Sequence, residues 1–414
     1  MKSSWLDLKA LNGAPYWIAA VVVGLVAVTY STAFNGCIAF SSWVAPQHPY
    51  FFMALSPACF LLGSWIVIRF APGAGGAGIA NITTAIDMPI TGSRDEIERF
   101  VSLRVAIIVI ASSLLCVLGG GALGREGPMV QIAACLFYFV GRRFKDVWPF
   151  EEHRSWIIAG GAAGVAAAFQ TPLAGIIFVI EELAHQHFRQ FKTYVISAVV
   201  ISGMIAQWLF GRYLFLGYAK VETVPFNSVG WALGLGMVCG VGASCFELTR
   251  RITSRRTSIF FSNKRLYIAL FSSAVVVAIA LLVDSRSIGG GIGLVEELLF
   301  DPTARADWKL IAARFFGTIF THLSGCAGGF LAPSLALGAA IGSWFAVITK
   351  YHSHNLVVLL GMAAFLGAIT RAPFTALVIV MEMTDSHAAI FPLMVACLAS
   401  NATESFLTGR FRKL

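Results

Sequence analysis

Uncharged stretches of roughly helix length recur along the whole chain. Residues Ala10 to Ile68 include no Asp, Glu, Lys or Arg, and because one membrane span needs about 20 apolar residues, this stretch alone holds at least two spans. Further charge-free runs are Val105–Gly124, Ser155–Ile180, Thr193–Gly211, Thr223–Phe246, Leu266–Val283, Phe315–Thr349 and Tyr351–Thr370. The pattern predicts an all-α polytopic membrane protein with ten or more membrane segments, several of them broken or too long to be simple spans.

Composition and charge support this class of protein. The 414 residues are 57% hydrophobic and 12% charged, with a mean hydropathy of +0.78, which lies outside the range of soluble proteins. The net charge of +9 is densest in residues 249–265, and the positive-inside rule places this segment and both basic termini in the cytoplasm. Such apolar flanks argue against nucleic-acid binding. The first apolar run is too long for a cleavable signal peptide.

These features divide the chain into five parts. We expect a cytoplasmic N-terminus (1–13), a first membrane repeat (14–248), a basic cytoplasmic loop (249–265), a second membrane repeat (266–409) and a short basic C-terminus (410–414). The eight cysteines lie in or beside apolar segments without CxxC spacing. They are best interpreted as small buried hydrophobic residues, so we expect no disulfide, no metal and no cofactor.

The sequence Gly124-Arg125-Glu126-Gly127-Pro128 joins one apolar run to the next. Proline at the first position of a helix costs no hydrogen bond, so we expect a helix to begin at Pro128. The glycines would leave backbone N–H groups bare at the positive end of the helix dipole, which would form an anion-binding site, here called the anion seat. Glu126 would be a tethered anion that competes for this seat and leaves it when protonated. An ordinary capped helix with a local Arg125–Glu126 pair is the alternative, but a charge in apolar sequence is costly and favours a functional site.

Another glycine-rich segment, Gly73 to Gly78, spells the GxGxxG pattern of dinucleotide-binding loops. That pattern requires a preceding strand in a βαβ unit, whereas the preceding segment here is typical of a membrane helix, so we reject NAD binding. A glycine-rich break within a membrane is tolerated where the backbone lines a cavity or is buried in protein. Glycines that serve only tight helix packing are the alternative.

The two halves of the chain contain matching sequences. Pro172 and Glu181 match Pro373 and Glu382, and both pairs are 201 residues apart. Two further matches are 126–128 with 331–333, at a spacing of 205, and 76–79 with 289–292, at a spacing of 213. Related halves with glycine-broken helices in matching places are typical of transporters whose substrate site lies at the interface of the repeats.

The second half supplies another candidate anion seat. Ser324 to Pro333 contains three glycines before its proline, and its N–H groups would meet the same anion from a second side. Glu181 and Glu182 end a long apolar helix; since successive helix positions lie about 100° apart, only one would face a pathway, and a cap is the alternative. His322 and Ser324 hint at an intramembrane serine hydrolase, but residues two apart do not face each other on a helix, so we reject this enzyme.

Taken together, these motifs resemble the CLC family of chloride channels and proton-coupled chloride antiporters, over about residues 15 to 409. Residues 124–128 are the family's GREGP motif in full, and GGFLAP at 328–333 resembles its GGxFAP. AFQTPLAG at 168–175, followed by Glu181-Glu182, resembles its AFNAPLAG and EE pair, and 381–385 resemble its EMTD.

The resemblance implies a homodimer in which each subunit has its own anion pathway, built from two inverted repeats with broken and re-entrant helices. Glu126 would be the gating carboxylate and Glu182 the inner proton-transfer carboxylate. The anion-binding residues would be Gly76, Ala77, Gly78, Arg125, Glu126, Gly127, Phe330 and Leu331. As in compact prokaryotic members, we expect no cytoplasmic nucleotide-binding domain, and a multi-pass location in the inner (plasma) membrane.

Three departures from the family pattern bear on selectivity. GSGIP becomes GAGIA at 76–80, so Ala77 replaces a serine hydroxyl that would touch the central anion. The family's pore tyrosine has no counterpart, because no Tyr follows Tyr351, and acidic residues are replaced at 81–84. With two hydroxyl donors lost, the centre would keep only backbone amides, and its anion affinity would fall about tenfold or more.

Our first hypothesis is therefore proton-coupled antiport of chloride or a related halide, with Glu126 as gate and Glu182 as inner proton carrier. The rival hypothesis is a passive, voltage- or pH-gated anion channel, favoured by the missing hydroxyls. The sequence leaves the preferred anion open among chloride, fluoride and nitrate.

Overall fold

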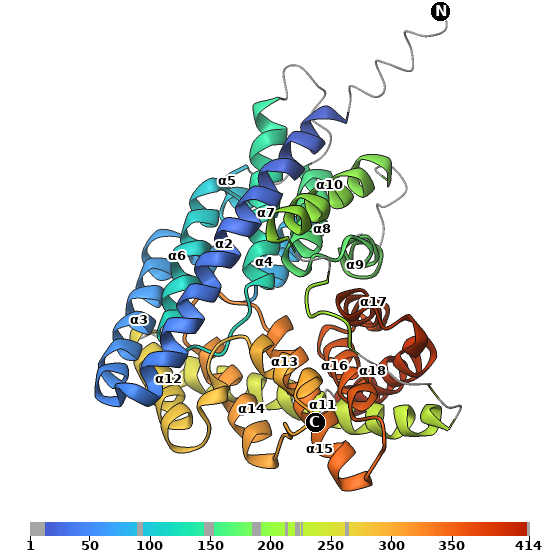
Figure 1. Cartoon of the computed structure of the whole chain (residues 1–414). Coiled ribbons are helices and arrows are strands. Elements are labelled where there is room, and N and C mark those ends of the chain that lie inside the picture. Colours follow the sequence, from blue (N-terminus) through green and yellow to red (C-terminus); the bar gives the residue numbers. More distant parts are fainter. Residues whose placement is uncertain are drawn as a thin grey trace, which may run out of the picture.

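The computed structural model describes residues 13–88, 94–144, 153–183, 192–211, 214–219, 224, 227–260 and 265–411. The expected N-terminal segment lies outside these residues except for Gly13, as does the end of the C-terminal segment, 412–414. Helices make up nearly all of the described chain (Figure 1). The strand-like contacts in this part are two isolated bridges, Gly76 with Ala327 and Gly124 with Gly329.

The first half of the chain forms the following helices: α2 (Ala14–Gln47), α3 (Pro49–Phe70), η1 (Pro72–Ala74), α4 (Gly78–Asp87), α5 (Arg94–Glu98), α6 (Leu103–Leu118), α7 (Glu126–Arg143), α8 (His153–Phe169), α9 (Pro172–Phe178), η2 (Val179–Leu183, a π-helical turn) and α10 (Lys192–Phe210). The second half forms α11 (Ser228–Phe260), α12 (Arg265–Leu282), η3 (Ser285–Ser287), α13 (Ile292–Phe300), α14 (Trp308–Leu323), α15 (Leu331–Thr349), α16 (His354–Thr370), α17 (Pro373–Thr384), η4 (His387–Ala389) and α18 (Ile390–Phe411).

Eight helices of the described residues are long and apolar enough to cross a membrane. Two shorter apolar helices, α16 and α17, add to them. Together they agree with the expectation of ten or more membrane segments, several of them broken, because α16 and α17 are too short to cross about 30 Å of hydrocarbon at 1.5 Å per residue. Broken helices of this kind are stable at membrane depth only when protein surrounds their ends.

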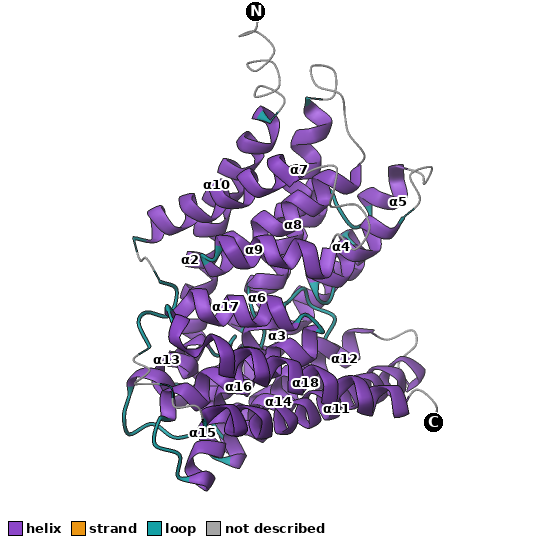
Figure 2. Ribbon diagram, turned by 90° about the vertical axis from the view of Figure 1, so that its right-hand side faces the viewer, coloured by secondary structure: helices purple, strands orange, loops and turns teal. Residues whose placement is uncertain are grey.

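The two halves repeat one packing order. Helix α8 packs against α7, α9 and α10, and α16 packs against α15, α17 and α18. Helices α9 and α17 also pack on each other where the halves meet, at mid-height of the molecule in both views (Figures 1 and 2). The sequence matches between the halves therefore correspond to matching helices.

Small residues allow the backbones in each half to approach closely. A Cβ at Gly160 of α8 would lie 2.6 Å from the Cα of Ala134 in α7, and a Cβ at Gly338 of α15 would lie 2.3 Å from the carbonyl oxygen of Gly361 in α16. Between membrane helices, where water does not drive association, such small-residue contacts are a main source of packing. Tight packing on each side fixes where α7 and α15 begin.

Two expected boundaries are wrong. The basic stretch predicted as a loop over 249–265 is helical as far as Phe260, because it continues α11. Glu247 forms ion pairs with Arg250 and Arg251 at the i+3 and i+4 spacings that a helix brings together. Helix α7 begins at Glu126 rather than at Pro128; the first turn of a helix has no intrahelical partners for its N–H groups, so proline is tolerated there as well.

Candidate functional site

Three helices begin at one place in the structure. Helices α4, α7 and α15 follow Ala77, Arg125 and Phe330, and within the described part of the chain none of these N-cap residues makes a side-chain capping bond. Each helix start therefore offers N–H groups that no capping side chain occupies, together with the positive end of the helix dipole. Such a group of helix starts attracts an anion.

Backbone hydrogen bonds join the three loops that lead into these helices. Gly124 and Gly329 exchange two bonds, with N–O distances of 2.7 and 3.0 Å. Gly76 donates to Cys326 at 3.2 Å and accepts from Gly328 at 3.1 Å. This corrects the expectation of a bare N–H group at Gly124, which is already bonded, and the N–H groups of Gly76, Gly328 and Gly329 are bonded as well.

Glycine is required here because the backbones touch. A Cβ at Gly78 would lie 2.1 Å from the carbonyl oxygen of Gly127, and a Cβ at Gly127 would lie 2.7 Å from the Cα of Gly329. The starts of α4, α7 and α15 are thus in direct contact. Glycine in these motifs serves close approach, while the N–H groups left for a ligand belong to the first residues of the helices.

Glu126 lies at this meeting point and is 1% exposed. A Cβ at Gly124 would lie 2.2 Å from Glu126 Oε2 and 3.0 Å from the Cβ of Ala332, so the carboxylate folds back toward the start of α15. The backbone N–H groups of Glu126 itself and of Ala332 interact with it. Its Oε2 atom is buried without a hydrogen-bond partner among the described residues.

Arg125 is adjacent to Glu126 in the sequence but forms only a long ion pair with its carboxylate. Its Nε atom is 4.0 Å from Glu126 Oε1, at the limit of an ion pair. The guanidinium instead bonds Asn35 Oδ1 at 3.3 Å and stacks over the ring of Phe215, 5.1 Å from its centroid. The negative charge of Glu126 is therefore balanced both by Arg125, at the limit of ion-pair distance, and by the helix starts.

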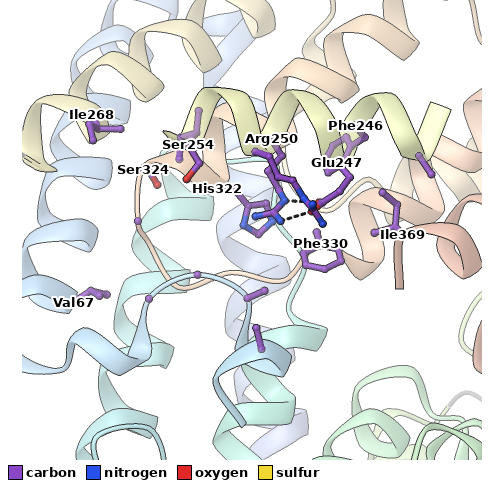
Figure 3. Close-up of a pocket in the computed structure, with 18 of the residues that line it drawn as sticks. Val67, Phe246, Glu247, Arg250, Ser254, Ile268, His322, Ser324, Phe330 and Ile369 are labelled. Atoms are coloured by element: carbon purple, nitrogen blue, oxygen red, sulfur yellow. Dashed lines mark hydrogen bonds and ion pairs between the residues drawn. The ribbon is translucent and has the colours of Figure 1, made fainter. Parts of the chain in front are cut away.

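Two cavities approach this site, and α15 begins between them. We call the first the Glu126 cavity; it measures about 690 Å³ and is lined by Arg125, Glu126 and Ala332 among others. The second, the Glu182 cavity, measures about 940 Å³ and is lined by Ala77, Glu182 and Phe330 among others (Figure 3). Phe330 lines one cavity and Ala332 the other, so the start of α15 and the Glu126 side chain lie between them.

Glycine turns at matching positions of the two repeats line opposite cavities. Gly75 and Gly76 line the Glu182 cavity, whereas Gly290 and Gly291 line the Glu126 cavity. Buried polar side chains hold both turns. Gln131 donates to the carbonyl of Gly73 at 2.9 Å and accepts from Asn81 at 3.2 Å. Arg314 donates to the carbonyls of Gly289 at 2.8 Å and Ile288 at 3.3 Å.

Glu181 and Glu182 have separate surroundings. Glu181 accepts bonds from the N–H groups of Phe374 at 3.1 Å and Thr375 at 2.6 Å, so it caps the start of α17. Glu382 of the other half accepts from Leu173 at 3.1 Å and Ala174 at 2.9 Å and caps α9 in return. Only Glu182 lines the cavity. The cap that the sequence offered as an alternative therefore holds for the first glutamate of the pair.

Sequence reasoning assigned no binding role to His322. This residue lies in the last turn of α14 and lines the Glu182 cavity beside Phe330, with ring centroids 5.6 Å apart. The sequence suggests His322 only as the partner of Ser324 in a hydrolase. In the structure the Ser324 hydroxyl donates instead to the carbonyl of Thr321 at 2.6 Å. A histidine in an apolar helix, just before a glycine-rich helix start, was the signal that could have identified it.

Comparisons with known proteins give one consistent result. Residues 58–405 match the family model described as voltage gated chloride channel. The H(+)/Cl(-) exchange transporter ClcA of Klebsiella pneumoniae (strain 342) is 30% identical over 95% of this chain and 86% of that protein. The same named transporter of Cronobacter sakazakii (strain ATCC BAA-894) is 32% identical over 84% of this chain and 75% of that protein.

Solved structures share the fold. A slow cyanobacterial Cl-/H+ antiporter superposes with a TM-score of 0.85 at 23% identity, covering 96% of this chain and 95% of that one. A CLC-type fluoride/proton antiporter superposes with a TM-score of 0.77 at 22% identity, covering 98% of both chains.

Proposed function

The chain belongs to the CLC family of voltage-gated chloride channels, a family of multi-pass membrane transporters and channels, and from that premise we propose that it exchanges chloride for protons. Its relatives from Klebsiella pneumoniae and Cronobacter sakazakii are named for that exchange. Exchange requires one site that an anion and a proton carrier occupy in turn, and Glu126 meets this requirement.

One observation carries the proposal: the Glu126 carboxylate lies at uncapped helix starts between two cavities. Deprotonated, it occupies the N–H groups of α7 and α15 and excludes chloride. Protonated, it loses its attraction for these groups, and chloride takes its place. Each anion that passes thus requires Glu126 to bind and release a proton. The anion is held by the helix starts at Ala77, Gly78, Gly127, Phe330 and Leu331.

Glu182 is the proton carrier on the other side in this proposal. It lines the cavity that lies across the start of α15 from Glu126. Arg371 and Glu404 line the same cavity and pair with each other at 3.0 Å, whereas Glu182 forms no ion pair within the described part of the chain. A carboxylate in such surroundings can take up and give off protons within a working pH range.

Flux in liposomes tests this function. With a chloride gradient imposed across the membrane, the reconstituted wild-type protein pumps protons against their gradient, and Glu182→Gln stops proton movement but leaves chloride flux. Glu181→Gln is the matched control: it alters a carboxylate that caps α17 and leaves proton coupling intact. Chloride flux without any proton movement in the wild type would contradict antiport.

A passive anion channel is the second candidate, and Ala77 favours it. Without a hydroxyl at this position the Glu182 cavity holds an anion less firmly, which suits rapid passage. Single-channel recordings in planar bilayers distinguish a channel from an exchanger, because a channel gives unitary conductance steps and an exchanger gives none.

We also propose that the protein forms a homodimer in a prokaryotic inner (plasma) membrane, with both termini in the cytoplasm. In this proposal the partner subunit covers exposed apolar side chains on adjoining helices: Leu173 of α9 is 47% exposed, Phe374 of α17 is 50% and Phe391 of α18 is 69%. Light scattering of the detergent-solubilised protein gives the mass of the assembly, and labelling of single cysteines placed at the termini gives their side.

A further inference from the structure

His322 occupies an unusual position for a polar side chain. Its ring packs edge-on against Phe330, with an interplanar angle of 67°, at the edge of the Glu182 cavity. Its Nε2 atom is buried, and no donor or acceptor among the described residues bonds it. A buried polar atom without a partner is costly, and in native structures it calls for an explanation such as an unseen ligand.

Ala77 and Ser324, which line the same cavity as His322, offer an anion no free hydroxyl. Ala77 has no hydroxyl, and Ser324 has turned its hydroxyl toward Thr321. Arg250 is labelled next to His322 in Figure 3, but its Nε and Nη2 atoms both donate to Glu247 at 2.8 Å. The unbonded imidazole is thus a donor available beside the start of α15, in a cavity that Arg251, Arg265 and Arg371 also line.

We propose that His322 is an anion ligand and a specificity-determining residue of the Glu182 cavity. In the tautomer that carries its proton on Nε2, the ring donates a hydrogen bond to an anion held by the backbone N–H groups at the start of α15. The imidazole thereby replaces the hydroxyl that Ala77 lacks. This inference rests on the proposed function, because it assumes that anions reach this cavity, and it replaces the expectation of a centre made of backbone amides alone.

A structural role for His322 predicts different behaviour. A histidine in the last turn of a helix can stabilise that helix through the dipole, and its loss would then lower thermal stability without changing the preference among anions. A ligand role changes affinity and preference while leaving stability nearly unaffected. Anion affinity and anion preference are therefore the informative measurements.

Calorimetric titration of the detergent-solubilised protein with chloride tests the ligand role. His322→Phe keeps the ring and its contact with Phe330 but removes the donor, so chloride should bind about tenfold more weakly or worse. His322→Gln places an amide N–H near the position of Nε2 and should bind within about threefold of wild type, since it restores the hydrogen bond. Thermal unfolding of each variant shows whether folding is preserved.

A second substitution keeps the proposal testable if His322→Phe folds poorly. Ala77→Ser adds a hydroxyl donor to the same cavity, so it should raise chloride affinity in the wild type and restore it in His322→Phe. The ratio of chloride to nitrate affinity should shift with His322→Phe and return with the serine. Unchanged affinity and unchanged anion ratio in a folded His322→Phe protein would overturn the proposal.

These titrations are independent of proton coupling. If the wild type carries chloride without protons, the proposed exchange fails, while the role of His322 is still decided by binding. If the wild type exchanges normally and His322→Phe binds and selects anions as the wild type does, the proposed exchange stands and the role of His322 is rejected.

Discussion

The chain carries two kinds of glutamate at the junction of its halves. Glu181 and Glu382 are equivalent in the repeat, 201 residues apart, and each caps the helix of the other half. Glu126 and Glu182 have no acidic equivalents, because the matching positions hold Leu331 and Met383. The two glutamates that are equivalent in the repeat, Glu181 and Glu382, join the halves. The two without an acidic equivalent, Glu126 and Glu182, line the cavities.

This difference separates scaffold from transport site. Repetition supplies two similar sets of helix starts, and a symmetrical arrangement would treat both sides of the membrane alike. Glu126, the proposed gate, is present in one half only, and Ala77 and His322 line a single cavity, so the two sides are chemically distinct.

Removal of the Glu126 charge tests the glutamates that have no equivalent in the repeat. It should have the largest effect on transport. Glu126→Gln has nearly the same shape but cannot release a proton, so proton movement driven by a chloride gradient should fall about a hundredfold or more. Chloride flux should persist, because a neutral side chain competes poorly for the helix starts. A pH electrode and a chloride electrode on the same liposomes measure both fluxes. Proton pumping at the wild-type rate would contradict the role of Glu126.

The glycines at the helix starts test the symmetric scaffold. Gly78 and Gly291 match in the repeat, and a Cβ would lie 2.1 Å from the Gly127 carbonyl oxygen at the first position and 2.5 Å from the Ala336 Cβ at the second. Alanine at either position should lower the free energy of unfolding by about 2–3 kcal/mol through overpacking. Thermal denaturation in detergent measures this loss. Gly36→Ala is the control, since a Cβ there meets nothing within 4 Å.

The reciprocal caps should give a smaller pair of effects, similar in size although Glu181 also accepts a bond from the Thr375 hydroxyl. Glu181→Gln and Glu382→Gln each weaken two hydrogen bonds from backbone N–H groups, and each should cost about 1–2 kcal/mol of stability. Because the carboxylates cap different helices, the double variant should lose the sum of the two costs. Denaturation of the three variants in detergent checks this additivity. A loss of proton coupling in Glu181→Gln would contradict the assignment of Glu181 to the scaffold.

A surface ion pair should give the smallest effect. Asp284, just outside the apolar part of α12, pairs with Arg286 at 2.8 Å. Partial burial raises the pKa of Asp284, but hydrogen bonds from the side chain and backbone of Arg286 lower it further, so the net pKa lies below its usual value. The pair therefore stabilises the protein above the unfolded pKa of about 3.9, and this contribution disappears as pH falls through the folded pKa.

Replacement of Asp284 checks that its pKa is lowered in the folded protein. Asp284→Asn should cost less than about 1 kcal/mol near neutral pH, because the pair is partly exposed to solvent. The difference from wild type in thermal stability should shrink as the pH is lowered. A difference that grows toward acid pH would show that the pKa is raised instead.

Sequence patterns predicted the helical membrane class and the two glycine-rich helix starts, because charge-free runs and proline positions are local signals. They could not show that the N–H group of Gly76 bonds Cys326, since that partner is 250 residues away. Glu181 and Glu182 are neighbours with the same chemistry, and only contact with α17 separates the cap from the cavity residue. The sequence did not predict the proposed anion-ligand role of His322. That role depends on the missing hydroxyl at Ala77 in the same cavity, and residues so far apart in the sequence form no local motif.

Bromide in crystals gives the most direct test of the central claim, that Glu126 and an anion compete for the same helix starts. In Glu126→Gln crystals soaked in bromide, the anomalous signal should appear at the starts of α7 and α15, where the wild-type carboxylate lies. In wild-type crystals at a pH where Glu126 is charged, that position should hold the carboxylate and no bromide. Bromide bound at the starts of α7 and α15 together with a charged Glu126, or bound elsewhere in both proteins, would contradict the competition.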